Sequence, residues 1–274
     1  MKPNEKYTPR LDGVPETLLW PLWNRAAEQQ VKQPLINDPM AVELLGKIDY
    51  DFEARFGKPN VGHPIRSRFF DDAATQWLQR NPQGLVISLG EGLDTQFWRI
   101  DNGAMRWLSV DLEESIRVRN QLLPEHGRIQ TLSCSAFDRT WMDQVSDKGP
   151  VFILMAGLLM FFKESEIFSL FRDMADRFPG SEFIFDAIPP WLAAKSMNKK
   201  GWRITKTYTA PQMPWGIRYK DVDTILAVHP ALQLKQRITY ADVSPKRMRP
   251  YSWLTKIPKL RDTIAPWMLH VKIG

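Results

Sequence analysis

Cysteine and histidine are scarce in this sequence. A single cysteine, Cys134, stands among 274 residues, and the four histidines lie far apart. One thiol cannot form a disulfide framework or a thiolate metal site, and no histidine stands at metal-ligand spacing from another ligand. The sequence therefore predicts no metal centre. Its cysteine content suits a reducing compartment, and we expect a cytoplasmic protein.

Long apolar runs are also missing. No run approaches the roughly 18–20 residues of a membrane span, and residues 1–10 are polar, unlike a signal peptide. The chain is 43% hydrophobic and 25% charged, which is typical of an ordinary globular protein. We expect no membrane partner. Without internal repeats or low-complexity linkers, residues 1–274 are interpreted as a single domain, whose oligomeric state the sequence does not indicate.

Acidic residues become rare in the final third. Residues 191–274 hold 16 lysines and arginines against 4 acidic residues, whereas the rest of the chain carries a net negative charge. Such a region fits an anionic substrate, a nucleic acid, a membrane surface or a merely solvated basic face. The basic residues are scattered instead of forming blocks, which argues against a disordered nucleic-acid-binding tail.

The first part of the chain has a helical pattern interrupted by prolines. Residues 1–60 are interpreted as a helical N-terminal cap. Within it, Asp38 is predicted to be a helix N-cap, with Pro39 as the first helical residue. Apolar residues at helical spacing predict a further helix over residues 64–80.

From residue 85 onward, strand and helix patterns alternate. Strands are predicted at 85–89, 107–110, 129–133, 151–155 and 182–188, with helices at 95–99, 113–123 and 163–178. This alternation predicts an α/β fold with a parallel sheet and helices on both faces.

Residues 190–223 break this alternation. They are rich in Trp, Met, Lys and Pro, and we interpret them as an inserted cap. The cap either packs on the core or gives an aromatic wall to a flat substrate, and we favour the wall. The sheet is then expected to resume with a pair of strand segments in residues 231–240. Beyond residue 245 the sequence is basic and interrupted by prolines, and no strand is assigned there.

A glycine turn follows the first predicted strand. Gly90 and Gly92 let the backbone bend sharply and expose its amide groups. Asp111 ends the second apolar run, 19 residues after Gly92. A carboxylate about 20 residues beyond such a turn is placed to bind a ribose diol. The pattern indicates a cofactor that contains adenosine.

Thr95 decides between the adenosine cofactors. It stands where a dinucleotide fingerprint has its third glycine, and the chain has no Gly-Lys-Ser/Thr phosphate loop. A cofactor without a pyrophosphate fits better. S-adenosyl-L-methionine (SAM) combines an adenosine, a sulfonium and an amino acid group, and has no phosphate.

Four motifs then make the pattern specific. They are residues 66–72 (RSRFFDD), 89–99 (LGEGLDTQFWR), 110–111 (VD) and 157–162 (GLLMFF). In this order and spacing, the chain resembles the leucine carboxyl methyltransferase superfamily over residues 12–240. It is more similar to the bacterial tetracenomycin-type polyketide O-methyltransferases than to the protein phosphatase branch. The resemblance implies a Rossmann-like class I methyltransferase with a mostly parallel seven-stranded sheet, SAM as cofactor, and a role in secondary metabolism.

The resemblance also implies a set of cofactor-binding residues. They are Arg66, Gly90, Gly92, Asp94, Asp111, Phe137 and Asp138. Arg66 would bind the SAM carboxylate, because a guanidinium suits that planar group, and Asp94 would meet the ammonium or support the turn. Asp111 would take both ribose hydroxyls. Asp138 would meet the adenine amine, with the ring of Phe137 beside it.

Three positions depart from the family pattern. Glu91 stands where the family often has a small residue, and Gln96 where it often has arginine. Ala156 stands where protein phosphatase-type members have a glutamate, which counts against methylation of a protein tail. The role of Glu91 stays open at this point.

The leading hypothesis is O-methylation of a small aromatic or polyketide-like metabolite, on a carboxylate or a phenolic hydroxyl. A carboxylate is already ionised at neutral pH, whereas a phenol, with a pKa of about 10, benefits from a general base. Asp186 and His63 are the candidates for that base. The alternatives are a carboxyl methyltransferase for a protein C-terminus and a nucleic-acid methyltransferase that uses the basic final third. The sequence disfavours nucleic acid, because no Asn/Asp-Pro-Pro-Tyr/Phe motif follows residues 151–155.

Overall fold

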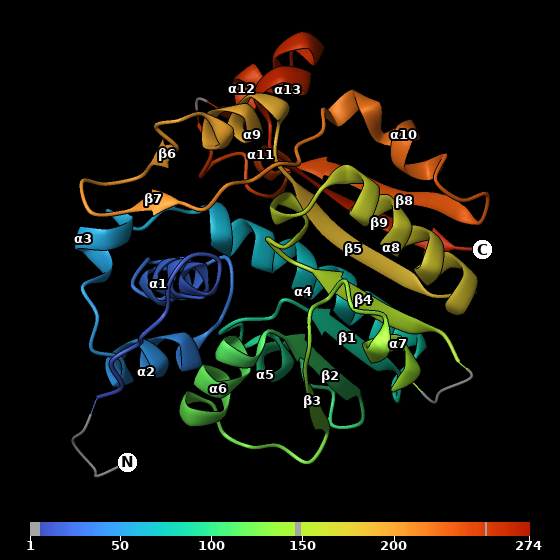
Figure 1. Cartoon of the computed structure of the whole chain (residues 1–274), viewed down its shortest axis with the longest axis horizontal. Helices are drawn as coiled ribbons and strands as arrows, with labels where there is room; N and C mark the ends of the chain where they lie inside the picture. Colours follow the sequence, from blue (N-terminus) through green and yellow to red (C-terminus); the bar gives the residue numbers. More distant parts are fainter. Residues whose placement is uncertain (1–5, 146–148, 250) are drawn as a thin grey trace.

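Among the residues that the computed structural model describes (6–145, 149–249 and 251–274), seven strands form one sheet in the order β3-β2-β1-β4-β5-β9-β8 (Figure 1). The strands are β1 (Leu85–Leu89), β2 (Arg106–Asp111), β3 (Ile129–Ser133), β4 (Val151–Met155), β5 (Glu182–Ala187), β8 (Leu232–Thr239) and β9 (Trp267–Ile273). Strands β1 to β5 are mutually parallel, and β9 runs antiparallel to both of its neighbours. The predicted α/β class, with a mostly parallel seven-stranded sheet, is confirmed.

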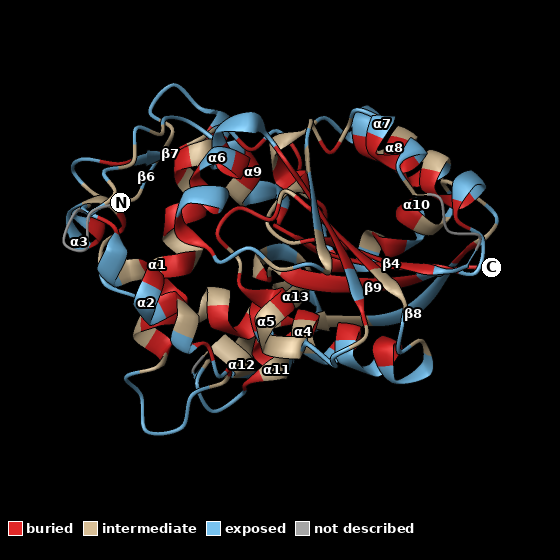
Figure 2. Ribbon diagram, turned by 90° about the horizontal axis from the view of Figure 1, so that it is seen from below, coloured by how far each residue is buried: buried red, intermediate tan, exposed pale blue. Residues whose placement is uncertain are grey.

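Helices cover both faces of the sheet. They are α1 (Leu19–Glu28), α2 (Pro39–Lys47), α3 (Phe52–Phe56), α4 (Gly62–Arg80), α5 (Gln96–Ile100), α6 (Glu113–Leu122), α7 (Thr140–Asp143), α8 (Glu164–Arg177), α9 (Pro190–Met197), α10 (Val222–Leu226), α11 (Tyr240–Val243), α12 (Tyr251–Leu254) and α13 (Pro258–Ile264). Short 3-10 helices span Pro15–Leu18, Leu159–Phe161 and Tyr219–Asp221, and a small hairpin joins β6 (Trp202–Arg203) to β7 (Thr209–Ala210). In Figure 2 the buried strands lie between helices whose outer sides are exposed.

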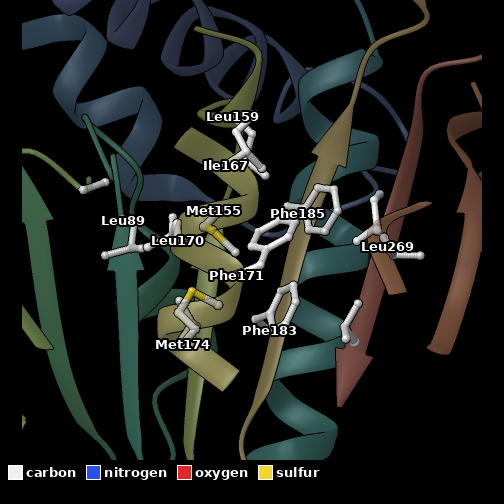
Figure 3. Packing of buried hydrophobic residues seen from close by; sticks show 14 of the residues in the cluster. Leu89, Met155, Leu159, Ile167, Leu170, Phe171, Met174, Phe183, Phe185 and Leu269 are labelled. Atoms are coloured by element: carbon white, nitrogen blue, oxygen red, sulfur yellow. The ribbon is translucent and has the colours of Figure 1, made fainter. Parts of the chain in front are cut away.

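The alternation of side chains along each strand divides the core between the two faces. Phe171 and Met174 of α8 pack on one face, against Phe183 and Phe185 of β5 (Figure 3). On the other face, α4 and α5 pack against Val86, Trp107 and Phe152. Because both faces are covered at the centre of the sheet, the central strands β1 and β4 are almost entirely apolar in sequence.

The N-terminal region is helical, as predicted, with residues 1–5 outside the described part. The Asp38 carboxylate accepts the Ala41 backbone N–H at 3.1 Å, and Pro39 is the first residue of α2, so the predicted cap is confirmed. The N-terminal helices share a hydrophobic cluster with Tyr208 and Ala210 of the β6–β7 hairpin. Among the described residues, no helix is long and apolar enough to cross a bilayer.

The strands of the C-terminal part differ from the prediction in two ways. Residues 231–240 contain one strand, β8, with an irregularity between Leu234 and Gln236, instead of two segments. Its partner β9 comes from the segment where no strand was assigned. Strand β9 lies inside the sheet, between β5 and β8, and is buried on both faces. It therefore lacks the alternation of polar and apolar residues that marks a half-buried strand.

Glu182 on β5 supports a prediction about acid stability. Its carboxylate, 3% exposed, lies 2.6 Å from Lys235 Nζ, 2.8 Å from His270 Nε2 and 3.1 Å from Arg80 Nη2. Burial opposes its ionisation, but hydrogen bonds from His270 and Lys235 outweigh that effect and lower the pKa of Glu182 to about 2. Its folded-state pKa lies below the ordinary value of 4.5, so this contribution to stability is complete above pH 4.5 and is lost as the pH falls towards 2.

Glu182→Gln is expected to reduce the free energy of unfolding at pH 7 by about 2–3 kcal/mol. Between pH 4.5 and 2, the free energy of unfolding of the variant should fall less steeply than that of the wild-type protein. Urea unfolding at several pH values measures both. The control is Glu113→Gln, because the Glu113–Arg117 ion pair is exposed and contributes little. An unchanged pH profile in Glu182→Gln would contradict the prediction.

Candidate functional site

A cavity of about 570 Å³ opens at the carboxyl ends of the parallel strands. Gly90 after β1, Asp111 at the end of β2, Ala156 after β4 and Asp186 on β5 all line it. Ligands of open α/β sheets bind at this edge, and the volume is typical of a small-molecule site. The N-terminal helices, α4 and the β6–β7 hairpin complete the walls.

The glycine turn has a backbone that requires glycine. Gly90 and Gly92 have φ values of 67° and 55°, in the left-handed region. A Cβ atom at Gly90 would lie 2.7 Å from the side chain of Leu158. The Gly92 N–H donates to Asp111 Oδ2 at 2.7 Å, and the Leu112 N–H donates to Asp111 Oδ1 at 2.7 Å. The structure therefore brings the turn and the predicted ribose-binding carboxylate together. Burial raises the pKa of Asp111, against the effect of these backbone donors.

The Glu91 carboxylate is buried against two partners below the backbone of the glycine turn. Its side chain is 0% exposed and lies 3.0 Å from Arg119 Nη2, and the Trp107 indole N–H donates to its other oxygen at 3.2 Å. Burial raises the pKa of Glu91, while Arg119 acts in the opposite direction. Arg119 also donates to the backbone carbonyls of Gly92 and Asp94, at 2.7 and 2.9 Å. Glu91 therefore has a structural role: it pairs with Arg119, and Arg119 binds the backbone carbonyls of the glycine turn.

Thr95 ties the turn to the N-terminal helices. Its hydroxyl donates to Asp38, which also binds Arg25 at 2.9 Å and Arg99 at 3.2 Å. Arg25 in turn donates to the carbonyl of Leu93 at 2.7 Å. The position that lacks the third glycine therefore carries a structural hydrogen bond between two parts of the chain.

A buried ion network surrounds this contact; it consists of Arg25, Asp38, Asp71, Asp94 and Arg99. Asp94 lines the cavity and lies 2.7 Å from Arg99 Nη1. Although burial acts in the opposite direction, Arg25 and Arg99 hold the pKa of Asp94 below its ordinary value. Asp94 is therefore ionised, as an ammonium ligand would require.

Asp186 holds Arg66 in place. Its Oδ2 lies 3.1 Å from Arg66 Nη1 and accepts the Tyr240 hydroxyl at 3.0 Å, while its Oδ1 accepts the Gly157 N–H. Gly157 has φ of 68°, and a Cβ atom there would collide with the Arg66 guanidinium. Three donors engage the carboxylate, two at Oδ2 and one at Oδ1, so Asp186 holds Arg66 and the Gly157 turn instead of presenting a free carboxylate to a substrate. Tyr240 was not singled out from the sequence.

His63 lines the cavity as a neutral donor. The Asn60 N–H donates to Asn24 Oδ1 at 3.2 Å, which orients the amide so that Asn24 Nδ2 faces His63 Nδ1 at 2.5 Å. The amide must donate there, and the imidazole proton is therefore assigned to Nε2. Burial, together with Arg66 and Arg25, holds the pKa of His63 well below its usual value. The ring has its acceptor nitrogen occupied, which does not suit a general base.

Neither of the predicted adenine contacts, Phe137 and Asp138, lines the cavity, although their neighbours do. Ser135 and Ala136 line it, whereas Phe137 and Asp138 do not. Asp138 is exposed and accepts the Thr140 N–H at 3.1 Å, at the start of α7. Phe137 stacks on Phe162 with the ring centroids 3.8 Å apart. The side chain of Asp138 thus has a local capping role.

The cavity has an aromatic wall that the sequence revealed only in part. Trp202 and Tyr208 come from the segment expected to supply it, but Trp20 of α1 and Phe56 of α3 were not singled out. The segment after β4 adds apolar side chains to the cavity, because Leu158, Met160, Phe161 and Phe162 line it as well as packing on the core. The aromatic residues within 1–60 were the feature of the sequence from which this part of the wall could have been predicted.

Comparisons with known proteins agree with this geometry. The family model for leucine carboxyl methyltransferase matches residues 19–175. The tetracenomycin polyketide synthesis O-methyltransferase TcmP of Streptomyces glaucescens is 32% identical over 227 residues, which cover 78% of this chain and 84% of that protein. The S-adenosyl-L-methionine-dependent methyltransferase dpfgK of Gibberella zeae is 28% identical, covering 89% of this chain and 88% of that protein.

At the level of fold, a solved structure from Thermobifida fusca YX, assigned as a methyltransferase, superposes with a TM-score of 0.54 at 13% identity. It covers 87% of this chain and 94% of the other. The fold, the glycine turn beside Asp111 and the sequence matches lead to one conclusion: the chain belongs to the leucine carboxyl methyltransferase family, in its tetracenomycin-type branch, and is a SAM-dependent methyltransferase.

Proposed function

We propose that this enzyme is an O-methyltransferase that transfers the methyl group of SAM to the carboxylate of a small aromatic, polyketide-like acid. The observation that carries the choice of a carboxylate is that neither candidate base is free. Asp186 is occupied by Arg66, Tyr240 and Gly157, and the acceptor nitrogen of His63 faces Asn24. A carboxylate needs no base, because it is ionised at neutral pH, whereas a phenol keeps its proton.

The remaining carboxylates at the cavity have other uses. Asp94 and Asp111 lie at the glycine turn, where we propose that SAM binds, and the Glu91 carboxylate is fully buried and paired with Arg119. Asp111 accepts the backbone N–H groups of Gly92 and Leu112 and a hydrogen bond from Ser115, and the four lone-pair positions of its carboxylate leave room for a ribose hydroxyl. Gln96 Nε2 is buried at the same turn without a partner among the described residues, so a polar ligand is expected beside it.

In this proposal Arg66 binds the cofactor carboxylate, Gly90 and Gly92 line the methionine part, and Asp94 meets the ammonium. Asp186 and Tyr240 act as positioning residues, because they hold the guanidinium of Arg66. Bound SAM supplies an electrophilic methyl group. The chain contributes alignment of the acceptor oxygen and exclusion of water, which can account for most of the acceleration of such a displacement.

His63 is proposed to orient the acceptor. Its Nε2–H has no hydrogen-bond partner among the described residues, and the ring lines the cavity between the cofactor turn and the N-terminal helices. A neutral N–H donor can hold one oxygen of a carboxylate while the other attacks. The nearby positive charges of Arg25 and Arg66 favour an anion in this region.

We also propose that residues 1–60 and 190–223 act as substrate caps on a single domain, in a cytoplasmic enzyme of secondary metabolism. Both segments contribute residues that line the cavity, which supports their role as substrate caps. The similarity to TcmP supports a role in secondary metabolism. The basic final third favours a small anionic substrate over nucleic acid, because several of its cations are paired within the fold. Examples are Lys235 with Glu182 and Arg247 with Glu28.

The purified enzyme is expected to form methyl esters from flat aromatic acids such as 2-naphthoate, and to leave 2-naphthol unmodified. The rate should change little between pH 6 and 9, because the acceptor is ionised throughout this range and no base has to titrate. Release of S-adenosylhomocysteine and mass spectrometry of the product give the measurement. Methylation of 2-naphthol with a rate that rises with pH would instead favour a phenolic acceptor. Turnover only on peptides or RNA would contradict the proposal.

A further inference from the structure

The buried arginine of α6, Arg119, holds the glycine turn without lining the cavity beside it. Its side chain is 5% exposed, and its Nη1 donates to the carbonyls of Gly92 at 2.7 Å and Asp94 at 2.9 Å. Arg119 instead lines a second cavity, of about 350 Å³, together with Trp98 and Leu123. It can therefore act on a ligand of the first cavity only through the turn.

Gly92 connects this arginine to the carboxylate that we propose for the ribose. Its carbonyl accepts the Arg119 hydrogen bond, and its N–H donates to Asp111 Oδ2 at 2.7 Å. The backbone there has φ of 55°, and a Cβ atom would lie 2.9 Å from the side chain of Leu18, so glycine is required. Any displacement of Gly92 therefore moves a donor that orients Asp111.

The charge of Arg119 acts in the same direction as this hydrogen bond. Burial raises the pKa of Asp111, whereas the N–H groups of Gly92 and Leu112 and the guanidinium of Arg119 oppose that rise. Each of them favours the ionised carboxylate, which only accepts hydrogen bonds and so suits the hydroxyls of a ribose. Arg119 thus supports Asp111 through its position and through its charge.

Glu91 keeps Arg119 in place. Its carboxylate lies 3.0 Å from Arg119 Nη2 and accepts the Trp107 indole N–H at 3.2 Å. Trp107 belongs to β2 and is buried, so the pair is anchored to the sheet. Among the described residues, no second carboxylate pairs with Arg119, and a buried guanidinium without such a partner is strongly unfavourable. The residue that departs from the family pattern therefore supplies the partner that this arginine needs.

Two further arginines support the turn at other points. Arg25 donates to the carbonyl of Leu93 at 2.7 Å, and Arg99 lies 2.7 Å from the carboxylate of Asp94. Neither is hydrogen-bonded to Gly92 in the part of the chain that the structure describes. The support next to the proposed ribose-binding carboxylate therefore comes from the arginine of α6.

We propose that Arg119, fixed by Glu91, is a positioning residue for the ribose of SAM: it holds Gly92, and through Gly92 it orients Asp111. The inference rests on the proposed function, because it takes the glycine turn as the SAM site. It gives the pair a task in cofactor affinity and none in acceptor binding. Loss of Arg119 therefore raises the KM for SAM, while kcat at saturating SAM stays close to its original value.

Arg119→Ala is expected to weaken binding of S-adenosylhomocysteine and of 5′-methylthioadenosine about tenfold each. 5′-Methylthioadenosine contains the ribose and lacks the amino acid group, so equal losses locate the effect at the ribose end. Binding of 2-naphthoate and kcat at saturating SAM should change by less than about twofold. Calorimetry measures the affinities, and release of S-adenosylhomocysteine measures turnover.

The second cavity permits a sharper test. Because Arg119 lines this cavity, the space vacated in Arg119→Ala opens to it, and ethylguanidinium matches the lost end of the side chain. Added ethylguanidinium is expected to restore the affinity of the variant for S-adenosylhomocysteine at least about threefold. Ethylammonium has the same charge but lacks the planar set of donors that reaches two carbonyls, so it should have little effect. Neither compound should change the affinity of the wild-type protein.

Two other variants control the result. Arg117→Ala is the matched control, because Arg117 lies on the same helix and forms an exposed pair with Glu113. Its affinities should equal those of the wild-type protein. Glu91→Gln keeps the shape of the side chain and removes its charge, and we expect a loss of about threefold for both nucleoside ligands. It tests the inference independently if circular dichroism shows that Arg119→Ala does not fold.

Unchanged affinity for S-adenosylhomocysteine in the folded variants of Arg119 and Glu91 would overturn the inference. So would an equal loss for 2-naphthoate, or a recovery with ethylguanidinium no greater than with ethylammonium. The proposed SAM site fails separately, if Asp111→Ala also leaves the affinity unchanged. A loss in Asp111→Ala alone keeps that site and removes only the role of Arg119.

Discussion

Asp111→Ala is expected to weaken SAM binding by about 100-fold. In the proposed site the carboxylate accepts two ribose hydroxyls, and hydrogen bonds to a charged group contribute about 1.5–3 kcal/mol each. The substitution also leaves the Gly92 N–H without its acceptor at 2.7 Å, which loosens the glycine turn. Calorimetric titration of the purified variant with SAM, and separately with S-adenosylhomocysteine, measures the change.

Two further variants make this result specific. Asp111→Asn keeps the size of the side chain and one acceptor oxygen, so an intermediate loss is expected. Asp138→Ala should leave the affinity unchanged, because that exposed side chain accepts the Thr140 N–H and does not line the cavity. An unaltered affinity in Asp111→Ala would show that the cofactor binds elsewhere. A large loss in Asp138→Ala would restore the adenine role that the family resemblance implied.

Asp38→Ala is expected to be the most destabilising single substitution considered, with a loss of about 3–5 kcal/mol. It removes the N-cap of α2 and leaves Arg25 without its closest carboxylate partner, in a side chain that is 2% exposed. The hydroxyl of Thr95 and the guanidinium of Arg99 lose a partner as well. The loss of one of the negative charges that balance the buried cations Arg25 and Arg99 accounts for most of the effect. Urea unfolding followed by circular dichroism gives the free energy.

The matched control is Asp72→Ala, because the ion pair of Asp72 with Arg68 is about half exposed on α4. Its removal is expected to change stability by less than about 1 kcal/mol. Asp38→Asn should fall between the two, since asparagine also caps helices but carries no charge to balance Arg25. If Asp38→Ala and Asp72→Ala had the same small effect, the buried ion network would not hold the N-terminal helices in place.

Local patterns in the sequence were sufficient for several features. Asp38 before Pro39 marked a helix start, because capping depends on residues a few positions apart. The order of apolar runs and helical spacings predicted the parallel part of the sheet. The two glycines and Asp111 predicted a turn and a carboxylate at one sheet edge, because the spacing between adjacent parallel strands places them there.

Local sequence patterns did not predict strand β9. Its seven residues, with His270 and Lys272 among the apolar side chains, follow a segment of prolines and basic residues, and they form a strand by pairing with β5 and β8. Pairing between residues 182–187 and 267–273 is a non-local contact, which no local pattern contains. The two segments of the aromatic wall, around Trp20 and Tyr208, are separated in sequence in the same way.

Short-range spacing and motifs in order were enough to predict the α/β class, the glycine turn with Asp111 and a SAM-type cofactor. Which individual side chains are free to act depends on the folded chain. It turned Glu91 towards Arg119, occupied both oxygens of Asp186 and fixed the proton of His63 on Nε2. Whether a carboxylate or an imidazole is available depends on the partners that folding brings to it, and these come from distant parts of the chain.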